Sequence, residues 1–237
     1  MHNLNIKSAN KDYQVNFYKE IDDIIKSIKD KKAFYLIDEN VYLLYKDYFK
    51  YKPRLVVPAL ETSKTLDYAS NIFDHLINRD FKSDVHLVVI GGGILQDLGG
   101  FIASTFCRGV KYTLVPTTLL AMCDSCIGGK TSINHHKRKN ILGTFYPPDE
   151  VKISLEFLNT LDKRNLFSGY GELIKFYCLD NNIFNIDLDN LEECVYYGLN
   201  KKSKIIQTDE FDKGVRKLLN FGHTFGHALE SASNYAI

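Results

Sequence analysis

Two histidines near the end of the chain lie four residues apart, in a stretch whose other polar residues could also bind a ligand. The sequence RKLLNFGHTFGHALE contains Arg216, Asn220, His223 and His227. On a helix at this spacing the four side chains share one face. Two imidazoles, a guanidinium and a carboxamide suit a metal or phosphate site better than a hydrophobic core. The spacing therefore predicts a helix with a binding face. Two structural histidines are the alternative.

A second helical pattern adds a carboxylate and an amine. Glu172 and Lys175 stand one turn apart in SGYGELIK, which is the spacing of a surface ion pair. Glu172 follows two glycines and is set among apolar residues, so it is also a candidate hard-oxygen metal ligand. Glu172 with His223 and His227 suggests a His-His-Glu zinc site, in which a fourth position stays open for substrate.

A third candidate is the segment DSCIGGK, from Asp124 to Lys130, which combines an acid, two glycines and a lysine. It follows a strand and turn, so we expect it near the carboxyl edge of a sheet, where open α/β sheets bind ligands. It could hold a phosphate or a hydroxyl group, although the spacing of a nucleoside triphosphate P-loop is missing. A flexible surface loop is the alternative. The basic runs at 135–139 and 201–204 could face a phosphorylated small molecule or simply solvent.

A glycine turn follows the most apolar strand pattern. Val85 to Ile90 is continuously apolar, as expected of a strand covered on both faces, and it runs into Gly91, Gly92 and Gly93. A helical stretch, ILQDLGGFIASTFC, comes next. Glycines between a strand and a helix N-terminus let backbone N–H groups approach a pyrophosphate closely. The pattern is not G-x-G-x-x-G, so a turn with only a structural role is the alternative.

The elements that must position these residues follow an alternating order. Short β-rich runs (AFYLID, RLVVPAL, HLVVIGGG and KYTLVPTT) each precede a polar or helical stretch, which predicts a parallel sheet with crossover helices. The first residues read as a strand pair. From about Glu156 the pattern is mostly helical. We therefore predict two domains, an α/β domain over 1–150 and a helical domain over 151–237.

Composition describes an ordinary globular protein. The chain has 237 residues, with 30 Lys plus Arg against 29 Asp plus Glu. This balance gives no electrostatic footprint for nucleic acid. No run approaches the roughly 18 to 20 apolar residues of a membrane helix, and the start lacks a secretory pattern, so we expect a cytoplasmic protein with no membrane partner. The five cysteines are irregularly spaced, which argues for reduced thiols.

A metal site on the helical half, facing a glycine-rich nucleotide site on the α/β half, predicts chemistry in an interdomain cleft. Metal plus nicotinamide suggests oxidation of a metal-bound hydroxyl group. The residues themselves do not define the substrate.

Taken together in order, the motifs GGGILQDLGGFIASTFCRG, VPTTLLAMCDSCIGGKTSIN, KNILGTFYPP, GELIK and RKLLNFGHTFGHALE resemble the 3-dehydroquinate synthase family of sugar phosphate cyclases. The resemblance covers roughly Asp38 to Glu230. It implies an α/β N-terminal Rossmann-like NAD domain followed by a mostly α-helical metal and substrate domain, in a homodimer.

The resemblance also implies a reaction. The family converts 3-deoxy-D-arabino-heptulosonate 7-phosphate to 3-dehydroquinate and phosphate, in the shikimate pathway of aromatic amino acid biosynthesis. NAD is used catalytically: a hydroxyl is oxidised, phosphate is eliminated, the ketone is reduced, and the ring opens and closes by an aldol step. Oxidation helps because a ketone acidifies the adjacent C–H, and a divalent metal, zinc or cobalt, polarises the oxygen where charge develops.

By the same resemblance, the site residues fall into two groups. The implied NAD contacts are Asp38, Asn40, Glu61, Lys64, Gly92, Gly93, Asp97, Thr117, Thr118, Lys139, Asn140, Phe157 and Thr160. The implied catalytic and substrate contacts are Asp124, Lys130, Lys175, Lys202, Arg216, Asn220, His227 and, reaching the neighbouring subunit, Arg108.

For the metal, the family pattern uses Glu172, His223 and a later histidine in a segment that normally follows HTFGHALE. His227 then resembles a substrate or proton-transfer residue, which replaces the zinc-ligand role suggested by its spacing. The sequence reaches Ile237 without a later histidine. We therefore expect either a fragment truncated at its C-terminus or a divergent member with an incomplete metal site.

Departures from the family pattern keep other functions open. Gln96 stands where the family often has glycine, and Asn165 where an acid is common. The alternatives are another sugar phosphate cyclase, acting for example on sedoheptulose 7-phosphate, a metal- and NAD-dependent polyol dehydrogenase, and an inactive truncated remnant that binds NAD. A dehydrogenase would turn over NAD, whereas a cyclase would not.

Overall fold

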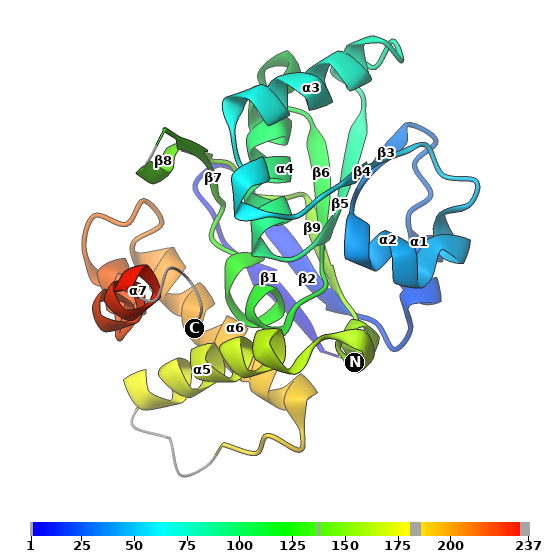
Figure 1. The fold of residues 1–237 in the computed structure, drawn as a ribbon. Coiled ribbons are helices and arrows are strands. Elements are labelled where there is room, and N and C mark those ends of the chain that lie inside the picture. The colour runs from blue at the N-terminus through cyan, green and yellow to red at the C-terminus, as the bar shows by residue number, and fades with distance from the viewer. Residues whose placement is uncertain (1, 137, 181–185, 233–237) are drawn as a thin grey trace.

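The first layer of the molecule is a seven-stranded sheet, seen in a computed structural model that describes residues 2–136, 138–180 and 186–232 (Figure 1). The strand order is β1-β2-β9-β6-β5-β3-β4. The strands are β1 (Asn3–Ile6), β2 (Tyr13–Phe17), β3 (Ala33–Asp38), β4 (Arg54–Val57), β5 (His86–Gly91), β6 (Lys111–Pro116) and β9 (Glu150–Ile153). Only β1 and β2 pair antiparallel, and the other pairs are parallel. The predicted strand pair and parallel sheet are confirmed.

Helices cover the sheet as crossover connections. They are α1 (Ile21–Ser27), α2 (Glu39–Tyr45), α3 (Leu66–Ile77) and α4 (Gly93–Thr105), with short 3₁₀ turns η1 (Lys46–Phe49), η2 (Glu61–Ser63) and η3 (Phe106–Arg108). In Figure 1, α3 and α4 lie on one side of the strands, and α1 and α2 on the other. Every residue of β5 is buried, as its continuous apolar pattern predicts. The centre of the sheet therefore lies inside the hydrophobic core, which also includes residues of the helices on both sides.

The chain reverses its direction of travel across the sheet at β3. From β3 it crosses to β4 on one side, and from β4 it returns to β5 on the other side of β3. Such a switch point leaves a crevice at the carboxyl ends of the two flanking strands. Here β3 ends at Asp38 and β5 at Gly91, and a Cβ atom placed on Gly91 would lie 3.3 Å from the Cβ of Asp38.

A hairpin that the sequence patterns did not reveal follows β6. After the π-helical turn η4 (Ala121–Ser125), β7 (Lys130–His135) and β8 (Arg138–Phe145) form a separate antiparallel pair that packs against α4. The alternative of a flexible loop at DSCIGGK is wrong, because Ile127, Gly128 and Gly129 are buried.

The second half is helical, as predicted. It contains η5 (Leu155–Thr160), α5 (Lys163–Leu179), α6 (Leu191–Thr208), η7 (Val215–Asn220) and α7 (His223–Ala232). Helices α5 and α6 pack on each other and on η4. The sheet continues through β9 to Ile153, three residues past the predicted domain limit at 150. Among the described helices none is both long and apolar enough to cross a membrane.

One predicted helix is broken. We expected Arg216, Asn220, His223 and His227 on one helical face, but η7 ends at Asn220 and α7 begins at His223. The turn between them contains Gly222 with φ of 80°, a backbone conformation that interrupts a right-handed helix. The first two residues and the two histidines therefore belong to different helices.

Candidate active site

A cavity of about 800 Å³ opens at the switch point of the sheet. It brings together all the predicted NAD contacts except Lys139 and Asn140. These are Asp38, Asn40, Glu61, Lys64, Gly92, Gly93, Asp97, Thr117, Thr118, Phe157 and Thr160. The residues lie at the ends of β3, β5 and β6 and in the segments that follow β3, β4, β5, β6 and β9, so parallel strand pairing is what gathers them.

The glycine turn forms one wall of this cavity. Gly92 is the N-cap of α4, so this helix begins at the cavity. The unpaired N–H groups of its first turn point out of the helix end toward the cavity. A Cβ atom on Gly92 would lie 3.0 Å from Cγ2 of Thr118, which leaves little room for any other residue. The helix dipole favours a negative group at this end. A pyrophosphate fits this cradle in both shape and charge.

The cavity is also lined by an acid at the end of β3. Asp38 caps α2, and its Oδ1 accepts a hydrogen bond of 2.8 Å from the backbone N–H of Asn40. Burial raises the pKa of Asp38, while the backbone N–H groups of Asn40 and Val41 oppose that shift. A carboxylate here can accept hydrogen bonds from the hydroxyl groups of a ribose.

A buried lysine joins this cavity to the hairpin. Lys64 is 3% exposed, and its Nζ donates to Oδ2 of Asp97 at 2.7 Å and to Oδ1 of Asn140 at 2.6 Å. Asn134 donates to Oε1 of Glu61 at 2.8 Å and accepts from the backbone N–H of Asn140 at 2.9 Å. Burial raises the pKa of Asp97, and Lys64 partly offsets that shift. Residues of the hairpin therefore hold Lys64 and Glu61 in place at the first cavity.

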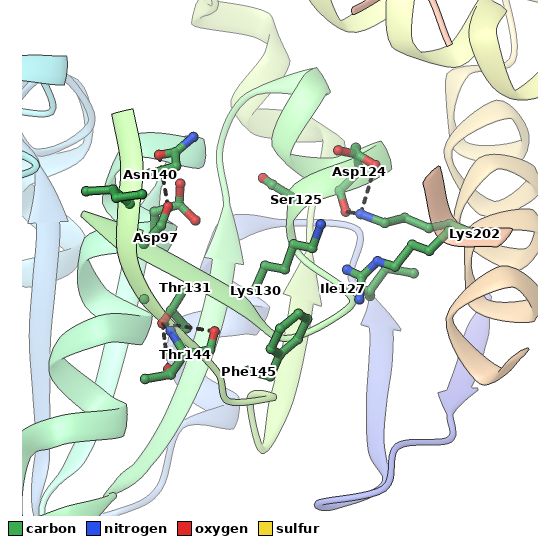
Figure 2. Close-up of a pocket in the computed structure, with 14 residues that line it drawn as sticks. Asp97, Asp124, Ser125, Ile127, Lys130, Thr131, Asn140, Thr144, Phe145 and Lys202 are labelled. Carbon is green, nitrogen blue, oxygen red and sulfur yellow. Dashed lines mark hydrogen bonds and ion pairs between the residues drawn. The ribbon is translucent and has the colours of Figure 1, made fainter. Parts of the chain in front are cut away.

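A second cavity of about 500 Å³ adjoins the first and shares Asp97 with it. Figure 2 shows its lining, which comes from η4, the hairpin, α6 and η7. Among the predicted substrate contacts, Asp124, Lys130, Lys202 and Arg216 line it, and so does Asn140 from the predicted NAD set. Three cationic side chains beside one cavity favour an anionic ligand such as a phosphate.

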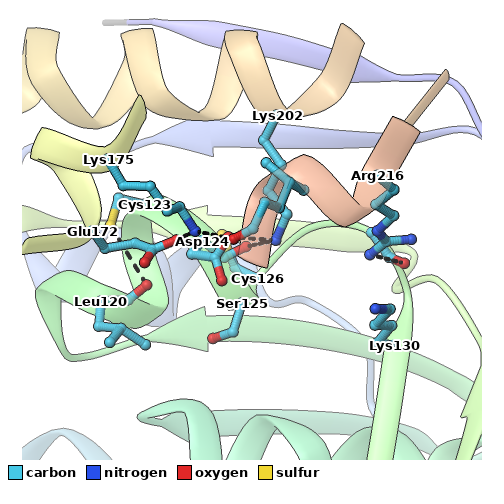
Figure 3. A network of polar contacts seen from close by, with 12 residues as sticks. Leu120, Cys123, Asp124, Ser125, Cys126, Lys130, Glu172, Lys175, Lys202 and Arg216 are labelled. Carbon is cyan, nitrogen blue, oxygen red and sulfur yellow. Dashed lines mark hydrogen bonds and ion pairs between the residues drawn. The ribbon is translucent and has the colours of Figure 1, made fainter. Parts of the chain in front are cut away.

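Behind that cavity lies a compact network of charges (Figure 3). Nζ of Lys202 donates to Oδ1 of Asp124 at 2.8 Å and to its backbone carbonyl at 2.6 Å. Nζ of Lys175 contacts the carboxylate of Glu172 and donates to the carbonyl of Leu219 at 2.8 Å. Lys175 and Glu172 are 7% and 8% exposed, so the alternative of a surface ion pair is wrong.

The pKa values of the two carboxyl groups in this network are shifted in opposite directions. Burial would raise the pKa of Asp124, but Lys202 and Lys175 outweigh burial and hold it below the ordinary value. Burial, together with the negative charge of Asp124, raises the pKa of Glu172 to about 7. Asp124 is therefore the carboxylate that stays ionised near neutral pH.

Arg216 fastens the glycine segment 128–130 to the helical half. Its guanidinium donates to the carbonyl of Gly128 at 3.1 Å and also to that of Glu210. Gly128 has φ of 99°. The next cation, Lys130, contacts Asp212. Burial lowers the pKa of Arg216, although its guanidinium remains charged at neutral pH.

The other predicted residues lie further out. Asn220 is exposed at the end of η7, and the partly exposed His223 starts α7. Arg108 is exposed on η3, at the opposite end of α4 from the glycine turn, so it does not line either cavity of its own chain. Lys139 lies on β8 beside Asn140 and is not among the lining residues. The side chain of His227 falls outside the described part of the structure.

The donor set fits NAD more fully than it fits a metal. Glu172 and His223 are of zinc-ligand type. Within the described residues, however, no group of three His, Cys, Asp or Glu side chains could hold a metal ion. The carboxylate of Glu172 is also paired with Lys175. The metal role of Glu172 and His223 stays a prediction.

Some lining residues were missed from the sequence, although a signal existed. Ser132 lines the second cavity and Asn134 is tied to Glu61. Both lie on β7 with Lys130, at the alternating positions that share one face of a strand. Assignment of GGKTSIN as a strand would have placed them beside the lysine.

A glycine turn at the switch point of a parallel sheet, next to a cationic cavity lined by helices, defines a Rossmann-like α/β fold with a helical second part. Solved structures share this fold. The fold matches 2-deoxy-scyllo-inosose synthase with a TM-score of 0.86 at 24% identity, over 100% of this chain and 72% of that one. It matches 2-epi-5-epi-valiolone synthase from Streptomyces hygroscopicus subsp. jinggangensis 5008, solved with NAD+ and Zn2+, with a TM-score of 0.81 at 24% identity, over 95% and 69%. The predicted fold class is confirmed.

The particular family comes from the sequence comparisons. The family models for the 3-dehydroquinate synthase N-terminal and C-terminal regions match residues 54–168 and 169–237. The 3-dehydroquinate synthase of Streptococcus pyogenes serotype M3 is 37% identical over 98% of this chain and 70% of its own length. That of Thermoanaerobacter sp. strain X514 is 38% identical over 92% and 67%. The chain belongs to the 3-dehydroquinate synthase family.

Proposed function

We propose that the chain acts as a 3-dehydroquinate synthase, which converts 3-deoxy-D-arabino-heptulosonate 7-phosphate to 3-dehydroquinate and phosphate. One observation carries the proposal beyond family membership: the glycine-turn cavity and the cationic cavity adjoin and share Asp97. A cofactor in the first cavity would meet a sugar phosphate in the second, which the redox and elimination steps both require.

In the second cavity the cations bind the anionic end of the substrate. Lys130 and Arg216 suit the phosphate, because guanidinium and ammonium groups both pair well with its oxygens. Asp124 and Lys202 form a charge pair at the same wall, 2.8 Å apart. Asp124, which stays ionised, can accept a hydrogen bond or a proton from a substrate hydroxyl group.

Bound NAD would supply a hydride acceptor and then the donor that returns the hydride, so that the cofactor would be regenerated. The residues of this chain hold it in place. The first turn of α4 would hold the pyrophosphate, and Asp38 would accept hydrogen bonds from a ribose. Lys64 neutralises Asp97 at the boundary between the cavities, which keeps an unpaired negative charge away from the reacting groups.

A zinc or cobalt ion would be held by Glu172 and His223, and it would polarise the substrate oxygen on which charge develops. The structure of 2-deoxy-scyllo-inosose synthase with carbaglucose-6-phosphate, NAD+ and Co2+ shows such a combination on the same fold. Binding of the ion requires displacement of Lys175 from Glu172, because a metal and an ammonium group compete for one carboxylate.

The proposal includes a homodimer in the cytoplasm. Arg108 is exposed at the far end of α4 and lines neither cavity of its own chain, so the substrate role implied by the resemblance would place it at a neighbouring subunit's site. Gel filtration or sedimentation of the purified chain tests the dimer directly.

A substrate panel tests the proposed function. With NAD and zinc or cobalt present, we expect phosphate release from 3-deoxy-D-arabino-heptulosonate 7-phosphate and little from sedoheptulose 7-phosphate or glucose 6-phosphate. The product is identified by mass spectrometry and NMR. If the chain prefers another sugar phosphate, it is a different sugar phosphate cyclase and not a 3-dehydroquinate synthase. Accumulation of NADH with glycerol, without phosphate release from any substrate, would indicate a polyol dehydrogenase instead.

A further inference from the structure

Gln96 and Ser125 form a partly buried contact at the boundary of the two cavities. Gln96 lies in the first half of α4, directly before Asp97, and is 4% exposed. The hydroxyl of Ser125 donates to its Oε1 at 2.7 Å. Ser125 lines the second cavity, and Figure 3 shows its side chain pointing away from the Asp124–Lys202 pair.

The position of the serine oxygen is well defined. A Cβ atom placed on Gly93 would lie 3.5 Å from Oγ of Ser125. Gly93 lines the first cavity, whereas Ser125 lines the second. The hydroxyl therefore stands where a cofactor and a substrate would meet, on the same side of the second cavity as the glycine turn.

Hydrogen-bond chemistry restricts what this hydroxyl can do. A serine has one proton to donate, and here that proton goes to Gln96, so its remaining lone pairs can only accept. Nε2 of the same glutamine is buried and has no hydrogen-bond partner among the described residues. A fully ionised phosphate cannot donate to Ser125, whereas a sugar hydroxyl can.

We propose that Ser125 is a further substrate-contacting residue, which accepts a hydrogen bond from a hydroxyl group of the sugar phosphate where the two cavities meet. Gln96 is its positioning residue, because it directs the serine proton away from the cavity. The pair thereby orients the substrate: the phosphate lies toward Lys130 and Arg216, and the hydroxyl-bearing carbons lie toward the glycine turn. The inference rests on the proposed function, which supplies a hydroxylated substrate.

Binding measurements on single variants test the contact. In calorimetry with NAD present, Ser125→Ala should lower the affinity for 3-deoxy-D-arabino-heptulosonate 7-phosphate about five- to tenfold, which is the effect of one lost hydrogen bond. Its affinities for NAD and for inorganic phosphate should stay within about twofold of the parent, because neither ligand uses the serine as an acceptor. Unchanged NAD affinity also shows that the variant is folded.

The glutamine is tested by a pair of substitutions. Gln96→Met keeps a similar volume but removes the acceptor of the serine proton, so it should lower the affinity for the sugar phosphate about three- to tenfold. The double variant with Ser125→Ala should be no weaker than Ser125→Ala alone, because the two residues act through one contact. Ser104→Ala is the matched control: Ser104 lies on the same helix, and its hydroxyl donates to the carbonyl of Phe101.

Several results would overturn the inference. If Ser125→Ala binds the sugar phosphate as tightly as the parent does, Ser125 does not contact the substrate. Equal weakening of sugar phosphate and inorganic phosphate would assign Ser125 to the phosphate instead. Additive effects in the double variant would remove the positioning role of Gln96. A parent chain that binds NAD but no sugar phosphate would contradict the proposed function, and with it the inference built on that function.

Discussion

At the scale of single residues, two buried lysines pair with carboxylates that line the cavities. Lys64 neutralises Asp97 on the cofactor side, and Lys202 neutralises Asp124 on the substrate side. Both lysines are almost fully buried. Each lysine therefore gives a positively charged partner to a carboxyl group at the edge of a cavity, where an unpaired carboxylate would be costly.

We predict that Lys64→Met lowers the free energy of unfolding by about 1–3 kcal/mol, because it leaves the carboxylate of Asp97 without its partner. The lower part of that range allows for the 26% exposure of the Asp97 side chain. Urea unfolding of the purified variant measures the loss. Lys82→Met is the control, since its pair with Asp80 is exposed and should change stability by less than about 0.5 kcal/mol. Equal losses in the two variants would contradict the role of burial.

Most of the site residues implied by the resemblance line one of the two cavities, but the sequence did not predict how they pair. Lys64 and Asn140 were implied as separate cofactor contacts, whereas the structure joins them by a hydrogen bond of 2.6 Å. The residues are far apart in the chain, and only the hairpin brings them together. The sequence also did not reveal that the pair of Glu172 and Lys175 is buried, because their spacing suits a surface pair as well as a buried one.

At the scale of elements, β5, the glycine turn and α4 form the unit that builds the cofactor cavity. Gly99 allows α4 to approach β5 closely, because a Cβ atom there would lie 2.6 Å from Cγ2 of Val89. This close approach fixes the direction in which the first turn of α4 faces the cavity.

We predict opposite effects for two glycine-to-alanine changes in helices. Gly99→Ala should destabilise the protein by about 1–3 kcal/mol, because the new methyl group overlaps Val89. Gly171→Ala on α5 should stabilise it by about 0.5–1 kcal/mol, because no atom of the described residues lies within 4 Å of its Cβ position and alanine favours a helix. Thermal unfolding compares the two. A neutral Gly99→Ala would mean that α4 can move away from the sheet at little cost.

A buried histidine makes the adjacent strands β5 and β6 sensitive to acid. Nε2 of His86 lies 2.8 Å from Oγ1 of Thr113, and the ring faces Asp30 and Lys111. Burial and the positive charge of Lys111 lower the pKa of His86 below its ordinary value of 6.5. The unfolded chain therefore takes up a proton first as pH falls below 6.5, and the stability that neutral His86 contributes is lost there.

We predict that the midpoint of thermal unfolding falls more steeply between about pH 7 and 5.5 in the parent than in His86→Gln, which keeps a polar group but cannot titrate. The comparison removes the contribution of other acidic and basic groups, because both proteins share them. Identical slopes in the two proteins would show that His86 does not titrate differently on folding.

The elements themselves were predictable where the pattern was continuous. The apolar run into Gly91–Gly93 gave both β5 and the start of α4. The break between η7 and α7 was not foreseen, because polar residues at helical spacing continue across it. Its signal was Gly222, whose positive φ depends on the packing of both segments.

At the scale of the whole molecule, the helical half is tied back to the α/β half at several points. Arg216 donates to the carbonyl of Gly128. Glu210 accepts from the hydroxyl of Ser8 at 2.5 Å and from the backbone N–H of Ala9 at 2.6 Å. Figure 1 shows α5, α6 and α7 grouped beside the sheet edge that carries β1 and β2. These contacts hold the cationic wall of the second cavity against the first cavity.

The central claim is that NAD and a sugar phosphate bind in adjoining cavities and that the cofactor is regenerated within each turnover. One measurement tests it most directly: phosphate release and absorbance of NADH are recorded together while this chain acts on 3-deoxy-D-arabino-heptulosonate 7-phosphate with NAD and zinc or cobalt. We predict one 3-dehydroquinate per phosphate, no net NADH, and complete dependence on added NAD. Phosphate release without NAD, or NADH formed in proportion to product, would contradict the claim.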